Sequence, residues 1–191
     1  MRITNTRDSY GLLAILLHWL VAAAVVGLFA LGLWMVELTY YDTWYRTAPA
    51  IHKSVGVLLF GVVVVRLAWR QLGPRPAPLD SHRPFERRAA AVTHALLYAL
   101  LIAVMLTGYL ISTADGRPID VFGLFQVPAI ISGLPNQADI AGKVHLCLAV
   151  TLVSIAGLHA LAALKHHLLD HDRTLLRMLG RHPAAKIGTD A

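Results

Sequence analysis

The sequence predicts an all-α membrane protein, a bundle of four transmembrane helices with both termini in the cytoplasm. Hydrophobic residues make up 57% of the 191 residues, and charged residues only 15%. Runs without a charged residue, with histidine counted as neutral, recur at 9–36, 54–65, 89–114 and 144–164. Since about 20 mostly apolar residues cross the hydrocarbon of a bilayer, these runs are typical of membrane spans.

We expect helices near 11–36, 50–72, 89–113 and 139–168. The first run is too long for the apolar part of a cleaved signal peptide, and it contains His18 and Trp19. The second reaches spanning length if Lys53, Arg66 and Arg70 snorkel or face inward.

The connecting segments complete the predicted single domain, 1–191. Proline-rich residues 73–88 form a short cytoplasmic linker. The outer loop 114–138 is largely apolar, so it lies on the membrane surface or folds over the bundle as a lid. Residues 172–191 form a basic, loosely ordered cytoplasmic tail. The one cysteine, Cys147, excludes an internal disulfide, and we expect a buried, inert thiol.

Basic residues fix the predicted orientation. The outer side has only Arg46, Lys53, Arg117 and Lys143. Thirteen others fall on the side of the N-terminus, the 73–88 linker and the tail, which is cytoplasmic by the positive-inside rule. They are Arg2, Arg7, Arg66, Arg70, Arg75, Arg83, Arg87, Arg88, Lys165, Arg173, Arg177, Arg181 and Lys186.

Ten histidines are the main clue to chemistry. We expect His82, His171 and His182 to be solvent-exposed in loops or tail. Ionisable groups inside membrane spans tend to be functional, and four of them match in depth. His18 and His159 each lie some eight residues inside the cytoplasmic end of their helix, whereas His52 and His145 lie near the outer starts of theirs.

Two histidine pairs at two depths suit two haems with bis-histidine ligation inside a helical bundle. His145 and His159 share one face of their helix, about 40° and about 21 Å apart. Zinc is less suitable because it usually takes three or four ligands at one site. A proton relay or transporter, and purely structural polar contacts, remain as alternatives.

Further residues agree with haem binding. Arg66 follows His52 by 14 residues on the same face and reaches the inner level, where it is a candidate partner for haem propionates. Gly56 and Gly142 leave room for a flat macrocycle. His94 is an alternative inner ligand, or a contact to a propionate or a quinone. His166 is a candidate quinone ligand near the cytoplasm, since its pKa suits proton delivery. His167 is expected to be an interfacial polar residue.

These motifs resemble the bacterial cytochrome b561 family over nearly the whole chain. They are "LLAILLHWLVAA" around His18, "APAIHKSVGVLLFGVVVVRL" from His52 to Arg66, "THALLYALLIAVMLTGYLI" in the third helix, and "GKVHLCLAV", "IAGLHALAALKHH" and "DRTLLRML" at the end. The resemblance implies a multi-pass protein of the cytoplasmic (inner) membrane holding two haem b groups, with His18, His52, His145 and His159 as axial iron ligands.

The resemblance also implies electron transfer between the quinone pool, with ubiquinone as substrate, and a partner at the outer face. The family includes superoxide oxidases, which makes an oxidoreductase activity an expectation beside that of a simple electron carrier. Lys53, Arg117 and Lys143 would then attract a small anion, although Asp115 and Asp120 flank Arg117.

Two other classes stay open at this point. One is the cytochrome anchor subunit of a larger dehydrogenase or hydrogenase, which would have a peripheral protein partner. The other is a haem-free proton-coupled transporter, which four helices without internal repeats fit poorly. Lipid is an expected partner in every case, and nucleic acid is not.

Overall fold

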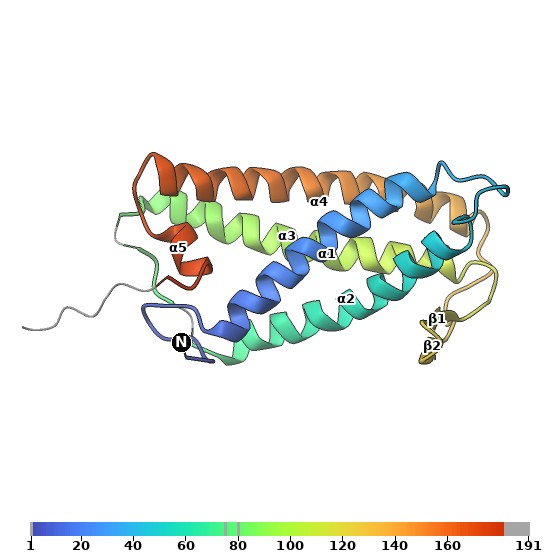
Figure 1. Ribbon diagram of the computed structural model, residues 1–191, viewed down its shortest axis with the longest axis horizontal. Coiled ribbons are helices and arrows are strands. Elements are labelled where there is room, and N and C mark those ends of the chain that lie inside the picture. Colours follow the sequence, from blue (N-terminus) through green and yellow to red (C-terminus); the bar gives the residue numbers. More distant parts are fainter. Residues whose placement is uncertain (1, 75, 80, 182–191) are drawn as a thin grey trace, which may run out of the picture.

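The computed structural model describes residues 2–74, 76–79 and 81–181. Four long helices form the molecule: α1 (Leu12–Met35), α2 (Thr47–Leu72), α3 (Pro84–Ser112) and α4 (Gln137–Leu168). Each is long and apolar enough to cross a membrane, which confirms the predicted spans. Figure 1 shows the four helices side by side, with the N-terminal segment and a short fifth helix, α5 (Thr174–Met178), at the same end.

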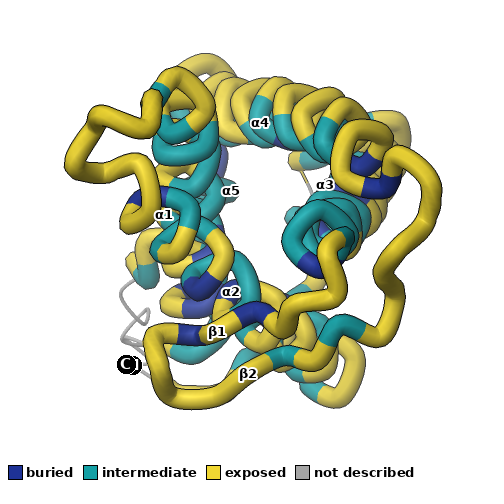
Figure 2. Tube along the Cα trace, turned by 90° about the vertical axis from the view of Figure 1, so that its right-hand side faces the viewer, coloured by how far each residue is buried: buried dark blue, intermediate teal, exposed yellow. Residues whose placement is uncertain are grey.

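The helices pack as two antiparallel hairpins, α1 with α2 and α3 with α4. Viewed along their length they surround a central axis (Figure 2). A cluster of buried aliphatic side chains joins all four helices at mid-height: Val21, Leu59, Val63, Leu100, Leu101 and Leu152. Most other apolar side chains on the helices are exposed, as expected where lipid covers the outer surface.

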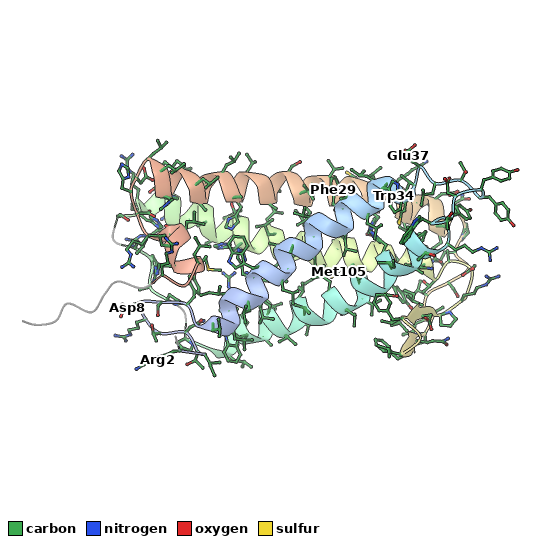
Figure 3. All side chains as sticks on the ribbon, viewed as in Figure 1. Arg2, Asp8, Phe29, Trp34, Glu37 and Met105 are labelled. Carbon is green, nitrogen blue, oxygen red and sulfur yellow. The ribbon has the colours of Figure 1, made fainter. Side chains whose placement is uncertain are left out.

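Polar atoms gather at the two ends of the bundle, and side-chain carbon dominates the middle (Figure 3). Arg2 and Asp8 lie at one end, and Glu37 lies at the other. A layer of this kind matches the hydrocarbon region of a bilayer between two polar interfaces.

The third helix begins earlier than the apolar pattern indicated, at Pro84 rather than near residue 89. Proline suits the first helical position because its missing N–H would have no partner there. Glu86 accepts a hydrogen bond from the Arg83 amide (2.9 Å), as in a capping box. The helix therefore extends beyond the hydrocarbon layer, which hydropathy alone does not detect.

The connection between α3 and α4 contains a β-hairpin that the sequence did not predict: β1 (Ile119–Val121) pairs antiparallel with β2 (Phe125–Val127). Ile119 and Val121 are buried. The Ser54 hydroxyl on α2 donates to the Asp120 carbonyl (3.2 Å) and accepts from the Phe122 amide (3.3 Å). The hairpin is thus fixed against the N-terminal part of α2 (Figure 2).

The described part of the tail is ordered, contrary to the expectation of a loose segment. Arg177 of α5 donates to the carbonyls of Asp8 (2.8 and 3.1 Å) and Ala77 (2.9 Å). The Trp19 indole donates to the Met178 carbonyl (2.9 Å). These bonds hold α5 against the N-terminal segment and the linker. The remainder of the expected tail, residues 182–191 with His182 and Lys186, lies outside the described residues.

Cys147 is exposed, so the expectation of a buried thiol is wrong. It follows His145 by two residues, which turns it about 200° around the helix axis. It therefore faces away from the bundle interior that His145 faces.

Candidate functional site

The four histidines matched by depth come together in two pairs. The ring centres of His18 on α1 and His159 on α4 lie 6.4 Å apart. Those of His52 on α2 and His145 on α4 lie 6.2 Å apart. The aliphatic cluster separates the two pairs, since Leu152 lies midway between His145 and His159 on α4.

These spacings can be compared with the requirement of a shared metal ion. With metal–nitrogen bonds of about 2.0 Å and roughly 1.1 Å from nitrogen to ring centre, two axial imidazoles have centres about 6.2 Å apart. Both pairs meet that requirement. A direct hydrogen bond between two imidazoles would bring their centres closer together. The residues present therefore fit bis-histidine haem ligation.

His145 is oriented by its neighbours on α3. Its Nδ1 lies 2.9 Å from the Val104 carbonyl and 3.2 Å from the Thr107 hydroxyl. A carbonyl only accepts, so Nδ1 carries the proton and Nε2 keeps its lone pair. Ligating histidines usually have such a partner, which fixes the tautomer and raises ligand basicity.

Two glycines lie against the rings of His52 and His145, the pair that the predicted orientation places on the outer side. A Cβ built on Gly32 would be 3.3 Å from His52 Cε1, and one on Gly108 would be 3.2 Å from His145 Cε1. By contrast, a Cβ on Gly56 or Gly142 would meet nothing within 4 Å. Gly32 and Gly108 thus admit the imidazoles, while Gly56 and Gly142 leave open space nearby.

His18 and His159, the inner pair in the predicted orientation, have basic and aromatic neighbours. The Arg66 guanidinium donates to His18 Nδ1 (2.9 Å). The guanidinium carbons of Arg66 and Arg70 lie 5.6 and 5.4 Å from the centre of the Tyr98 ring, which is the geometry of cation–π contacts. Arg66 therefore faces the bundle interior rather than snorkelling to the surface.

His94 is the second histidine near His159, at 5.2 Å between ring centres. That distance is about 1 Å shorter than a shared metal ion requires, whereas His18 meets the requirement. His94 thus lies beside the inner pair as a neighbour of His159.

His166 does not join that group. Its ring centre lies 4.7 Å from that of His82. Its Nδ1 lies 2.7 Å from Asp170 Oδ2 and 3.3 Å from Asp172 Oδ2. The expectation that His82 is solvent-exposed is wrong, because its side chain is only 17% exposed and bonds Asp172. His171 is exposed as expected.

The three cations predicted at the outer face differ in their surroundings. Lys53 and Lys143 are exposed and each lies within two residues of an outer histidine, His52 or His145. Arg117 forms an ion pair with Asp115 (3.3 Å), so its charge is partly offset. Asp120 instead caps the hairpin turn by accepting from the Gly123 amide (2.8 Å).

Sequence reasoning missed the groups that position the histidines. The Val104 carbonyl is backbone and leaves no side-chain signal. Gly32 was detectable in principle, because it lies 14 residues after His18 on the same face of the first helix.

Comparison with known proteins agrees with this architecture. The profile described as "Prokaryotic cytochrome b561" matches residues 9–181. The chain is 52% identical over 181 residues to "Cytochrome b561 homolog 2" of Escherichia coli (strain K12), covering 95% of this chain and 96% of that protein.

Two further relatives are more distant. "Probable superoxide oxidase CybB" of Yersinia pestis is 32% identical over 175 residues, covering 89% of this chain and 95% of that protein. "Cytochrome b561 homolog 1" of Escherichia coli (strain K12) is 25% identical over 171 residues, covering 87% and 94%. The chain belongs to the prokaryotic cytochrome b561 family, haem b proteins of membrane electron transfer, and is a multi-pass protein of the bacterial inner membrane.

Proposed function

We propose that this chain holds two haem b groups, one at each level of the bundle, and passes electrons between the faces of the inner membrane. His18 and His159 are the proposed inner ligands, and His52 and His145 the outer ones. The observation that carries the proposal is the spacing of both pairs, 6.4 and 6.2 Å between ring centres, at opposite ends of an apolar core. A haem held by two histidines would leave no open position on the iron, so it would exchange electrons rather than bind substrate.

The chain's own residues set the tautomers of the proposed ligands. The Val104 carbonyl holds the proton of His145 on Nδ1 and thereby leaves Nε2 free. Arg66 donates to His18 Nδ1, which favours a proton on Nε2. Ligation through Nε2 therefore requires Arg66 to release His18, and the released guanidinium is then available to a haem propionate.

We propose that quinone binds near the cytoplasmic haem, beside His94 and Arg66. His94 lies next to His159 but does not have the spacing of a ligand, so it remains available to a quinone carbonyl. His166 was the other candidate, but its neighbours are His82 and two carboxylates. The proposal therefore rests on His94.

We propose superoxide as the outer electron donor, with ubiquinone as the acceptor. One relative carries the name of a superoxide oxidase. Lys53 and Lys143 supply exposed positive charge next to the two outer ligands, and charge of this sign steers a small anion to its site. Arg117 contributes less because Asp115 pairs with it.

The first experiment is a dithionite-reduced minus oxidised spectrum of the purified protein, with haem quantified per chain. Two low-spin haems b are expected. His18→Ala and His52→Ala should each remove about one haem, whereas His94→Ala should retain both. One haem in the wild type, or loss of haem in His94→Ala, contradicts the assignment of ligands.

The second experiment tests donor and acceptor. Enzymatically generated superoxide should reduce the oxidised protein, and added ubiquinone should reoxidise it. Lys53→Glu with Lys143→Glu should slow the first reaction by about tenfold at low salt. Arg7→Glu with Arg88→Glu, two exposed positions at the other end of the bundle, makes the same change in charge and is the matched control. This anion site is refuted if the rate at which superoxide reduces the protein changes neither in the lysine variant nor with ionic strength.

A further inference from the structure

Three side chains at the cytoplasmic end of the bundle bring nitrogen and oxygen atoms to one point. His82 precedes α3, His166 lies in the last turn of α4, and Asp172 lies in the turn before α5. His82 Nε2 is 2.9 Å and His166 Nδ1 is 3.3 Å from the same carboxylate oxygen, Asp172 Oδ2. All three atoms lie within 4.8 Å of one another.

The cluster is shielded from solvent and held in place. The side chains of His82, His166 and Asp172 are 17%, 15% and 5% exposed. The Thr174 amide donates to Asp172 Oδ1 (2.8 Å), so the second oxygen, Oδ2, faces the imidazoles. Within the described chain, the ion pairs of Asp172 are with these two histidines.

Hydrogen bonding alone leaves the cluster incompletely satisfied. His166 Nδ1 is buried, and its contacts with Asp170 Oδ2 (2.7 Å) and Asp172 Oδ2 (3.3 Å) lack the geometry of good hydrogen bonds. Buried polar atoms are rarely left without a partner. A bound cation would satisfy the nitrogen lone pair and the carboxylate together.

The donor set and spacing match a transition metal. Two imidazole nitrogens and one carboxylate oxygen form the three-ligand set of many zinc sites. In a tetrahedral site with bonds of about 2.0–2.1 Å, ligand atoms lie about 3.3–3.4 Å apart, close to the 2.9 and 3.3 Å found here. We propose that His82, His166 and Asp172 bind a divalent transition metal ion, with zinc the best fit to their nitrogen and oxygen donors.

The fourth position falls to water or to Asp170. Asp170 Oδ2 lies 2.7 Å from His166 Nδ1 but also 2.6 Å from Lys165 Nζ. Glu86 shares the same lysine (3.2 Å). Lys165 thus pairs with Asp170 and Glu86, and Asp172 is the carboxylate that both histidines share.

The site connects three segments distant in sequence: the start of α3, the end of α4 and the turn into α5. A metal ion here therefore fixes the cytoplasmic end of the bundle to the part of the chain that packs on the N-terminal segment. This proposal does not depend on the haem assignment, because none of its ligands belongs to either histidine pair.

The test uses haem-loaded protein without a histidine tag, stripped with a chelator and dialysed against micromolar zinc. Mass spectrometry then counts zinc and iron in the same sample. We expect about one zinc per chain, and His82→Ala and Asp172→Asn should each weaken zinc binding about tenfold or more with unchanged iron. Unchanged iron shows that the variants still fold.

His171→Asn is the matched control. It removes an exposed imidazole next to Asp172, and asparagine tolerates the positive φ of 53° at this position. Zinc K-edge absorption should show about two imidazole ligands in the wild type and in this control. The proposal is overturned if the wild type binds no more zinc than His82→Ala does. It is also overturned if the wild type, His82→Ala, Asp172→Asn and His171→Asn all bind zinc equally. Wild type with little iron but normal zinc would count against the haem assignment alone.

Discussion

Gly108 on α3 is a sensitive position because its missing side chain makes room for the His145 ring. A Cβ there would lie 3.2 Å from His145 Cε1, whereas ordinary contacts begin near 3.4 Å. Gly108→Ala therefore requires the ring to move by about 0.2 Å, near the tolerance of a metal–ligand bond. Gly108→Val adds two methyl groups beyond that Cβ and requires a larger movement.

We therefore predict a graded loss of the outer haem. Gly108→Ala should retain two haems with about tenfold weaker retention of one of them, and Gly108→Val should retain about one. Haem per chain, from the reduced spectrum of purified protein, measures the effect. The inner pair should be unaffected because it lies at the other end of α4.

Gly61 on α2 provides the matched control. A Cβ at Gly61 meets nothing within 4 Å, so Gly61→Val makes the same chemical change on a membrane helix without a clash. Two full haems in Gly108→Val would refute the reasoning, and so would equal haem loss in Gly61→Val, since the effect would then reflect the helix rather than the ring.

Three further predictions follow from individual contacts. Thr107→Val removes the longer of two contacts to His145 Nδ1 (3.2 Å). The outer midpoint potential in a redox titration should therefore shift by no more than about 60 mV, the one-electron equivalent of one hydrogen bond. A shift well above about 100 mV would mean that the hydroxyl, not the Val104 carbonyl, orients the ring. Arg177→Ala removes three hydrogen bonds to backbone carbonyls. Limited proteolysis should therefore cut residues 2–11 faster than in the wild type. An unchanged rate would show that α5 does not hold this segment. Burial opposes the ionisation of Asp172, but hydrogen bonds from Thr174 and His82 outweigh this effect and lower its pKa. The stability that the Asp172 carboxylate contributes is therefore full above about pH 4 and is lost as the pH falls through the lowered pKa. Thermal melts of Asp172→Asn at a series of pH values should lack this contribution.

Depth along the predicted helices was sufficient to pair the histidines. Each span has a known length, so a residue's distance from the end of its helix gives its height in the bundle. His18 and His159 lie at one height, and His52 and His145 at the other, and the structure brings each pair together. The haem assignment itself is a proposal that this geometry supports.

Depth along the helices did not predict which residues meet where a helix extends beyond the hydrocarbon or where a loop folds back on the bundle. Helix α3 begins at Pro84, outside the apolar run, which brings His82 next to His166. The β-hairpin depends on the Ser54 hydroxyl, whose partners lie 66 and 68 residues away. Contacts of this kind arise from tertiary packing, and no local pattern in the sequence reports them.

The interior of the bundle also bears on the proton-coupled transporter considered from the sequence. A proton path needs polar groups or water at short intervals through the hydrocarbon. The buried polar residues of the described chain are Ser54, Thr113 and Gln137, near the β-hairpin, and Asp172, at the opposite end of the bundle. Between the histidine levels the buried cluster is entirely aliphatic. Electrons can tunnel through such a layer, whereas protons cannot cross it, so the structure favours electron transfer over proton transport.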